Sequence, residues 1–191
     1  MRIIAGSARR LPLKTVEGRD TRPTSDRIKE TLFNILSPSL PGCRFLDLFA
    51  GSGQMGLEAA SRGAKDVVLV ENSRKAAACI EGNISFTKLG DSCTLLVMDA
   101  ALAVRRMEGQ EPFDVIFMDP PYHKGLEQGI LEALSVSSLV GEDTEIVAES
   151  PLDTDFSYAE GLGYQTTREK IYKTNKHVFL HLERQCSGGN R

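Results

Sequence analysis

From residue 45 onward, short apolar segments alternate with longer segments in which apolar residues recur every three or four positions. Short apolar runs predict buried strands, and the longer period predicts amphipathic helices. The predicted strands are 45–49, 67–71, 94–98, 114–118 and 145–149, and the helices among them are 54–62, 73–89, 100–107 and 126–134. Strands and helices alternating at this spacing predict a mostly parallel, doubly wound α/β sheet.

The two ends of the chain depart from this alternation. Residues 164–172 and 177–183 are separated only by a short turn, so they should pair antiparallel as a C-terminal hairpin. Residues 2–5 and 11–16 flank a Gly-Ser-Ala-Arg-Arg turn, which predicts a second, N-terminal hairpin. A helix should follow it, capped by Thr24 and ending before Pro38.

The chain length of 191 residues is that of a single domain with a sizeable core. We expect residues 1–20 to form a basic hairpin extension, 21–185 the catalytic domain and 186–191 a frayed tail. The sequence contains neither an apolar run of about 18 residues nor a signal-peptide pattern. It therefore predicts a cytoplasmic protein with no membrane partner, and we expect a monomer.

Metal-binding spacings are absent from the sequence. The cysteines at positions 43, 79, 93 and 186 form no C-x-x-C pair, which argues against a zinc site and a redox motif. His177 and His181 would share one face of the last strand, but two histidines without a third ligand make a weak site. We expect no metal, and a plain structural role for these histidines.

Charge is distributed unevenly along the chain. The whole protein carries a formal charge of −3, but residues 1–29 hold eight Lys or Arg against three acids, a net +5, so the remainder carries −8. A basic appendage on an acidic body is typical of a protein with a polyanionic partner. The candidate phosphate-binding residues are Arg2, Arg9, Arg10, Arg22 and Arg27. The N-terminal N–H groups of the first helix could assist them.

The sequence Asp119-Pro120-Pro121-Tyr122 directly follows the apolar run 115–118. An exocyclic amine of a nucleobase is a poor nucleophile until acceptors hold its hydrogens, because its lone pair is delocalised into the ring. Asp119 provides one acceptor and the Pro120 carbonyl a second. Pro121 stiffens the turn, and the ring of Tyr122 offers a surface on which a base can stack. An ordinary proline-rich turn with a solvated acid is the alternative.

Further candidates should lie at the same edge of the sheet, where doubly wound folds bind ligands. The sequence Gly51-Ser52-Gly53-Gln54-Met55-Gly56 follows the first strand, and Asp47 precedes it. Glu71 ends the second strand, where a carboxylate can bind both hydroxyls of a ribose. Asp99 ends the third strand and could accept from an adenine amino group.

This set fits both NAD and S-adenosylmethionine (SAM), because each contains an adenosine. An acid inside the first strand suits the ammonium of a methionine moiety better than a pyrophosphate. The tetrapeptide 119–122 would also lie where SAM presents its methyl group, because the fourth strand neighbours the first in this topology. The expected SAM-binding residues are Asp47, Gly51, Ser52, Gly53, Glu71 and Asp99.

The glycine-rich loop and the Asp-Pro-Pro-Tyr tetrapeptide resemble those of SAM-dependent amino methyltransferases. The segment 22–36, Arg-Pro-Thr-Ser-Asp-Arg-Ile-Lys-Glu-Thr-Leu-Phe-Asn-Ile-Leu, resembles a signature of the bacterial 16S ribosomal RNA guanine-N2 methyltransferase family. The resemblance spans nearly the whole chain, although Gln54 and Met55 replace small apolar residues and the C-terminal hairpin matches loosely. It implies a Rossmann-like class I SAM-dependent methyltransferase fold with a mostly parallel seven-stranded sheet, an antiparallel C-terminal hairpin and a small N-terminal β-hairpin.

The same resemblance implies methyl transfer from SAM to the N2 amine of a guanine in 16S ribosomal RNA of the small ribosomal subunit. Its catalytic residues would be Asp119, Pro120, Pro121 and Tyr122. The tetrapeptide does not distinguish guanine N2 from adenine N6, so methylation of adenine in DNA or RNA, or of protein glutamine, is an alternative. More remote alternatives are an NAD-linked oxidoreductase and a noncatalytic RNA-binding module.

Overall fold

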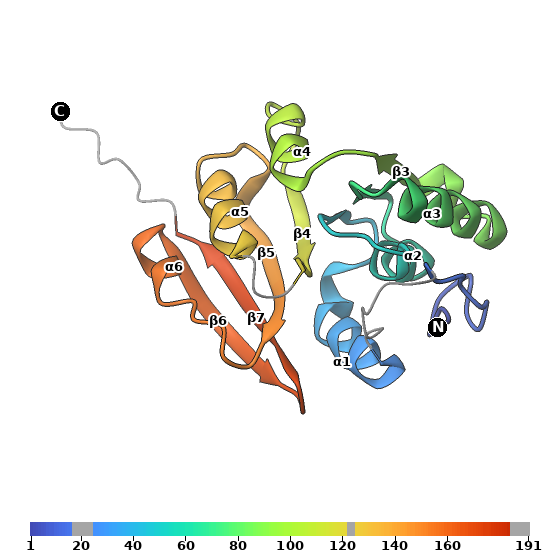
Figure 1. Ribbon diagram of the computed structural model, residues 1–191, viewed down its shortest axis with the longest axis horizontal. Coiled ribbons are helices and arrows are strands. Elements are labelled where there is room, and N and C mark those ends of the chain that lie inside the picture. Colours follow the sequence, from blue (N-terminus) through green and yellow to red (C-terminus); the bar gives the residue numbers. More distant parts are fainter. Residues whose placement is uncertain (17–24, 122–124, 184–191) are drawn as a thin grey trace.

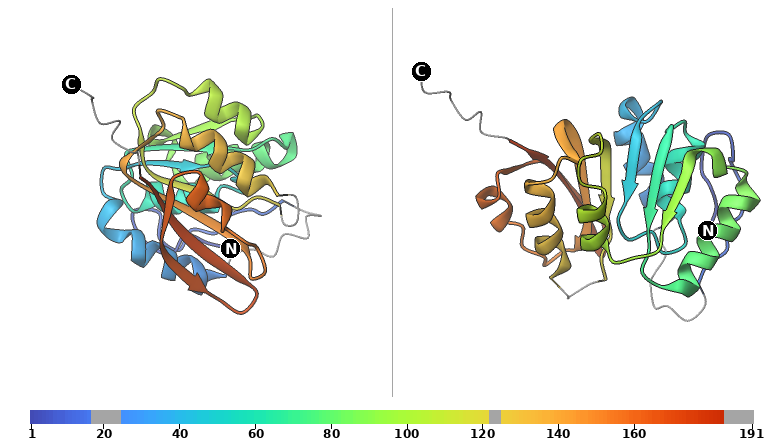
Figure 2. Two further views of the ribbon diagram at one scale, coloured as in Figure 1. Left: turned by 90° about the vertical axis from the view of Figure 1, so that its left-hand side faces the viewer. Right: turned by 90° about the horizontal axis from the view of Figure 1, so that it is seen from above.

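The computed structural model describes residues 1–16, 25–121 and 125–183, which form a seven-stranded sheet with helices on both faces (Figures 1 and 2). The strand order is β3-β2-β1-β4-β5-β7-β6. Strands β1 to β5 run parallel, whereas β7 pairs antiparallel with both β5 and β6. The predicted Rossmann-like class I fold, with its antiparallel C-terminal hairpin, is confirmed.

The strands are β1 (Arg44–Asp47), β2 (Asp66–Val70), β3 (Cys93–Leu96), β4 (Phe113–Met118), β5 (Val140–Pro151), β6 (Tyr164–Ile171) and β7 (Asn175–Leu182). The α-helices are α1 (Asp26–Leu36), α2 (Gln54–Ser61), α3 (Arg74–Thr87), α4 (Ala100–Arg106), α5 (Leu126–Ser135) and α6 (Tyr158–Gly161), and two 3-10 turns span η1 (Ser37–Ser39) and η2 (Gly90–Ser92). Every strand and helix predicted from residue 45 onward is present near its expected position.

Three local predictions differ from the structure. Ser25, and not Thr24, caps α1, because its hydroxyl accepts a hydrogen bond from the Ile28 N–H. Strand β5 begins five residues earlier than predicted, because its first residue, Val140, pairs with Phe113 of β4 ahead of a register shift. The single-turn helix α6 was not predicted, since four residues carry too little periodicity to be recognised.

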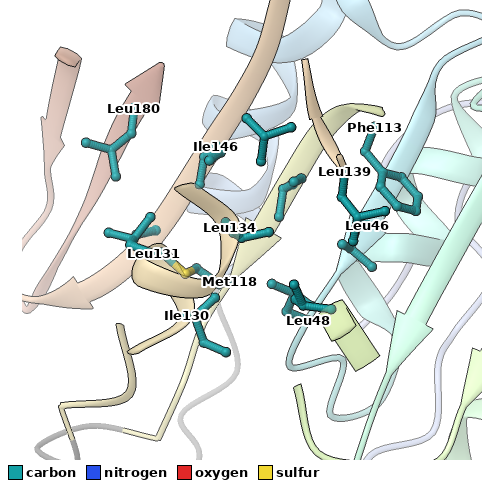
Figure 3. Packing of buried hydrophobic residues seen from close by; sticks show 14 of the residues in the cluster. Leu46, Leu48, Phe113, Met118, Ile130, Leu131, Leu134, Leu139, Ile146 and Leu180 are labelled. Carbon is teal, nitrogen blue, oxygen red and sulfur yellow. The ribbon is translucent and has the colours of Figure 1, made fainter. Parts of the chain in front are cut away.

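Two apolar clusters hold the sheet between its helices. On one face α4, α5 and α6 cover residues such as Ile116 and Met118 of β4, and on the other α1, α2 and α3 cover Val115 and Phe117. Figure 3 shows the α5 residues Ile130, Leu131 and Leu134 among Met118 and Ile146 of the sheet, and all five are at most 4% exposed. From Val115 to Met118, strand β4 is therefore buried on both faces, which explains the unbroken apolar run there, after the exposed Asp114.

The N-terminal segment 1–16 packs against α2 and α3 as a minimal hairpin. Arg2 and Pro12 form a single antiparallel bridge. Ile3, Ala8 and Leu13 are buried in a small cluster with Leu57 of α2. The predicted N-terminal hairpin is therefore present, but most of its attachment comes from the helices beneath it.

Glu58 of α2 is the main polar anchor of this segment. Its side chain is fully buried and accepts hydrogen bonds from the backbone N–H groups of Ile4 (2.7 Å) and Ala5 (3.0 Å). It also pairs with the fully buried Lys29 of α1 at 3.3 Å and with Arg62 at 2.8 Å. Burial lowers the pKa of Lys29, and the Glu58 carboxylate opposes this shift. One buried acid thus joins the N-terminal segment, α1 and α2.

No helix in the described parts of the chain is both long and apolar enough to cross a bilayer.

Glu58→Ala should lower the free energy of unfolding by about 3–5 kcal/mol, because it leaves the Lys29 ammonium buried without its partner. Urea denaturation followed by circular dichroism measures this change. The matched control is Glu169→Ala, which removes the half-exposed pair with Lys176 and should cost about 0–1 kcal/mol. Similar losses in the two variants would contradict the anchoring role of Glu58.

Candidate functional site

The carboxyl ends of the parallel strands bring the predicted acids to one edge of the sheet. Asp47 ends β1, Glu71 directly follows β2, and Asp119 directly follows β4. Strand β4 lies beside β1, with Phe117 opposite Asp47. The expected adjacency of the first and fourth strands is therefore present, and it is the point at which the strand order reverses. Ligands of doubly wound sheets bind at such a point.

The glycines after β1 serve different purposes. Gly51 and Gly53 have φ values of +59° and +80°, a conformation that other residues adopt only with strain. A Cβ at Gly51 would contact nothing within 4 Å, so the backbone there is open to a ligand. A Cβ at Gly56 would instead lie 2.8 Å from the side chain of Leu69. Gly56 therefore allows α2 to pack closely on β2.

The N–H groups of the glycine-rich loop donate hydrogen bonds to carboxylates of this chain. In a dinucleotide-binding loop the corresponding N–H groups donate to the pyrophosphate. Asp47 Oδ2 accepts from the Gly56 N–H at 3.1 Å, and Glu71 Oε2 accepts from the Gly51 N–H at 2.9 Å. The second oxygen of Glu71 accepts from the Ser73 N–H at 2.8 Å. Because a phosphate would meet two carboxylates here, the geometry favours a cationic ligand over NAD.

Asp47 is a buried acid that lacks a full set of partners. It is 1% exposed, and its Oδ1 atom has no hydrogen-bond partner among the described residues. Burial raises the pKa of Asp47 to about 7, and the nearby Glu71 adds to the shift. An unpaired buried carboxylate oxygen is costly unless a donor binds it. The ammonium group of a methionine moiety would be such a donor, so the residues present fit SAM.

Asp99 lies at the same edge but already has a structural task. It caps α4, where its Oδ1 accepts from the N–H groups of Ala101 (2.9 Å) and Leu102 (3.2 Å). Its side chain is exposed, and the apolar Val97 and Leu102 nearby are 46% and 47% exposed. The cap fixes the orientation of the Asp99 carboxylate.

Asp119 is surrounded by other acids. Its pKa is raised well above the ordinary range by burial and then, in decreasing order, by the charges of Glu149, Asp47 and Glu127. The residue itself is half-buried, Pro120 is buried and Pro121 is exposed. Tyr122, the fourth residue of the tetrapeptide, lies outside the described residues.

The structure adds a carboxylate that the sequence-based site omitted. Glu149 of β5 is 3% exposed and pairs with His177 of β7. Glu149 ends the predicted strand 145–149. An acid at the carboxyl end of a predicted strand was the criterion that selected Asp119, and the same criterion could have selected Glu149. The involvement of His177 was not visible, because it depends on the antiparallel pairing of β5 with β7.

The predicted phosphate-binding arginines are exposed where the structure describes them. Arg9 and Arg10 lie in the turn of the N-terminal segment, and Arg27 lies in the first turn of α1. Arg2 forms an exposed ion pair with Asp26 at 2.9 Å. Arg22 falls outside the described residues. Within residues 1–16, 25–121 and 125–183, no cluster of three or more His, Cys, Asp or Glu is arranged to hold a metal ion.

Comparison with known proteins gives consistent matches across most of the chain. The family model described as "Conserved hypothetical protein 95" matches residues 1–181. The chain is 34% identical to ribosomal RNA small subunit methyltransferase D of Escherichia coli over 171 residues, covering 90% of this chain and 84% of that protein. The protein of the same name from Haemophilus influenzae is 36% identical over 156 residues, 80% of each chain. A solved hypothetical protein from Thermus thermophilus superposes with a TM-score of 0.81 at 31% identity, covering 95% of this chain and 99% of that one.

Asp47→Asn should stabilise the ligand-free protein at pH 8 by about 2–4 kcal/mol. The folded-state pKa of about 7 lies above the ordinary value of 3.8, so ionisation of Asp47 opposes folding as the pH rises between these values. Urea denaturation at several pH values measures the gain, which should shrink from pH 8 toward pH 4. A variant that is less stable than wild type at pH 8 would contradict the raised pKa of Asp47.

Proposed function

The chain belongs to the ribosomal RNA small subunit methyltransferase D family, and from that premise we propose that it methylates the exocyclic N2 amine of a guanine in 16S ribosomal RNA, with SAM as methyl donor. The observation that supports the proposal is the pairing of β4 with β1, which brings Asp119 close to Asp47. We assign Asp119 as the amine acceptor and Asp47 as the acid that binds the cofactor. Such a reaction belongs in the cytoplasm, where ribosomes assemble.

The acidic edge of the sheet suits the SAM cation. Asp47 would pair with its ammonium group through Oδ1, the atom to which none of the described residues donates a hydrogen bond. Glu71 would accept from the ribose hydroxyls, and Asp99 from the adenine amino group. The open backbone at Gly51 leaves space for the ligand between them. When bound, SAM supplies an activated methyl group on a positively charged sulfur.

The end of β4 would hold the amine that receives the methyl group. Asp119 and the carbonyl of Pro120 each accept one amine hydrogen, which directs the nitrogen lone pair out of the base. Tyr122 would stack on the base, a contact worth roughly 1–3 kcal/mol. Rate acceleration then comes mainly from alignment of the nitrogen with the methyl group. A guanine in a single-stranded loop is the favoured target, because flipping it out costs less than in a duplex.

Asp119→Ala should lower kcat for methyl transfer by about 10²–10⁴-fold, because the amine loses a charged acceptor. Transfer of a labelled methyl group from SAM to small-subunit ribosomal RNA measures this rate. The control is Asp99→Ala, which should raise the KM for SAM more than it lowers kcat. A wild-type rate of methyl transfer in Asp119→Ala would show that Asp119 is not a catalytic residue.

The identity of the methylated group requires its own experiment. Mass mapping of ribosomal RNA from cells with and without the gene should show one N2-methylguanine that disappears in the deletion. Purified protein should also bind SAM and not NAD in calorimetry. Loss of a methylated adenine or a methylated protein glutamine, with ribosomal guanines unchanged, would favour the adenine or glutamine alternative.

Changing Arg9 and Arg10 together to Gln should weaken RNA binding and reduce its salt dependence. The two side chains are exposed in the N-terminal turn, and each phosphate contact that is lost should lower the slope of log K against log salt by about 0.7–0.9. Filter binding at several salt concentrations measures both effects. An unchanged slope would show that this segment does not contact phosphates.

A further inference from the structure

A buried network on β5 and β7 lies beside Asp119, and the methyl-transfer scheme above does not use it. Glu149 is 3% exposed and His177 is fully buried. His177 Nε2 lies 3.0 Å from Glu149 Oε2, and the side-chain amide of Asn175 donates to Glu149 Oε1 at 2.6 Å. Both carboxylate oxygens are therefore held by side chains of the antiparallel hairpin.

His177 is in turn held from its other side. Its Nδ1 atom lies 3.3 Å from the hydroxyl of Tyr172, and the Tyr172 ring contacts the imidazole edge to face at a centroid distance of 5.1 Å. Phe117 of β4 makes a second edge-to-face contact at 6.3 Å. Because packing and hydrogen bonds fix the imidazole, Glu149 has little freedom to move.

Strand register places Glu149 next to Asp119. Met118 lies opposite Ala148 in the β4–β5 pair, so the following residues, Asp119 and Glu149, adjoin across neighbouring strands. Neighbouring strands are about 4.8 Å apart. The β5–β7 pair then sets His177 opposite Glu149. Asp119 and Glu149 are thus neighbours on adjacent strands, and His177 lies opposite Glu149 on the next strand.

The other groups that act on the Asp119 charge are also acids. They come from three elements packed around it, namely Asp47 of β1, Glu127 of α5 and Glu149 of β5. Of these, Glu149 exerts the largest effect on Asp119. Burial and like charges both favour the protonated form of a carboxyl group. Asp119 therefore holds a proton more tightly than an ordinary aspartate.

Amine methylation leaves a proton that must go to an acceptor. When the nitrogen lone pair forms the bond to the methyl carbon, the nitrogen becomes cationic while it still carries its hydrogens. One N–H bond must then break, with its electrons returning to nitrogen and its proton passing to a base. An efficient base takes up a proton near the working pH, which an ordinary exposed aspartate does not.

We propose that Glu149, held in place by His177 and Tyr172, makes Asp119 the group that takes this proton, and not a hydrogen-bond acceptor alone. The inference rests on the proposed function. Glu149 is a positioning residue that acts through its charge on Asp119. Asp119 touches the amine, gains the proton as an O–H bond and later releases it to water.

The decisive measurement is an NMR titration of the Asp119 carboxyl carbon in the full-length protein without added ligand. In wild type, Asp119 should titrate well above the ordinary value of about 3.9. Glu149→Gln keeps an acceptor oxygen but removes the charge, and it should lower the Asp119 midpoint by roughly one pH unit or more. The acid limb of the kcat profile for methyl transfer should move to lower pH by the same amount.

The chain contains a matched control on the same two strands. His181 and Glu145 also form a cross-strand pair, at 3.3 Å, but nearer the amino-terminal end of β5 and partly exposed. Glu145→Gln removes the same charge from the same type of pair. It should leave both the Asp119 midpoint and the acid limb unchanged.

Asp119→Asn separates proton acceptance from hydrogen bonding, because the amide keeps an acceptor oxygen but is not a base at neutral pH. Its kcat should fall by about 10²-fold or more. A fully active Asp119→Asn enzyme, or an Asp119 midpoint near 3.9 in wild type, would overturn the inference even if Glu149→Gln failed to fold. An active Glu149→Gln enzyme with an unchanged midpoint would overturn it too. Absence of methyl transfer by wild type would instead overturn the proposed function.

Discussion

The parallel pairing of β4 with β1 is the constraint on which the functional site depends. These strands are distant in sequence, yet they pair with Phe117 opposite Asp47. The Leu48 N–H donates a hydrogen bond to the Phe117 carbonyl. Because parallel strands end at the same edge, Asp47 and the residue after β4 emerge together. The helices that follow β1 and β4 cover opposite faces of the sheet, α2 one and α5 the other. This divergence at the strand ends would allow the proposed ligands to reach both acids.

The buried carboxylates of this protein differ in how completely their oxygens are paired. Glu58 is satisfied by Lys29, Arg62 and two backbone N–H groups, and it joins three segments. Asp47, equally buried, has one oxygen without a hydrogen-bond partner in the described part of the chain, and burial raises its pKa. Paired buried charges specify a structure, whereas an incompletely paired one at a strand end marks a site for a ligand. Glu149 belongs to the first group, because Asn175 and His177 hold its two oxygens, and its charge also acts on Asp119.

The N-terminal segment is connected to the glycine-rich loop as well as to α2. Asn83 of α3 exchanges two hydrogen bonds with the backbone of Lys14, and its amide also donates to the Ser52 carbonyl at 2.9 Å. The Ser52 hydroxyl in turn contacts the sulfur of Met1 at 3.4 Å. The basic segment proposed to contact RNA and the loop proposed to contact SAM thus share one asparagine. If both proposals hold, a link of this kind would fix where phosphates bound by this segment lie relative to the methyl donor.

The sequence by itself determined the order of the elements, the parallel core and the acids at its edge, because burial on both faces demands continuous apolar strands and ligand sites follow strand ends. It also indicated Asp119 as a candidate, because an acid followed by two prolines at the end of a buried strand is costly unless a site uses these features. The pairing of β5 with β7 was not predicted: the sequence indicated only a plain structural role for His177, and the antiparallel register sets it opposite Glu149. Periodicity reports which face of an element is buried, but not which distant residue lies across from it. For that reason the charge environment of Asp119, set by Asp47, Glu127 and Glu149 from three separate elements, was decided by the tertiary structure alone.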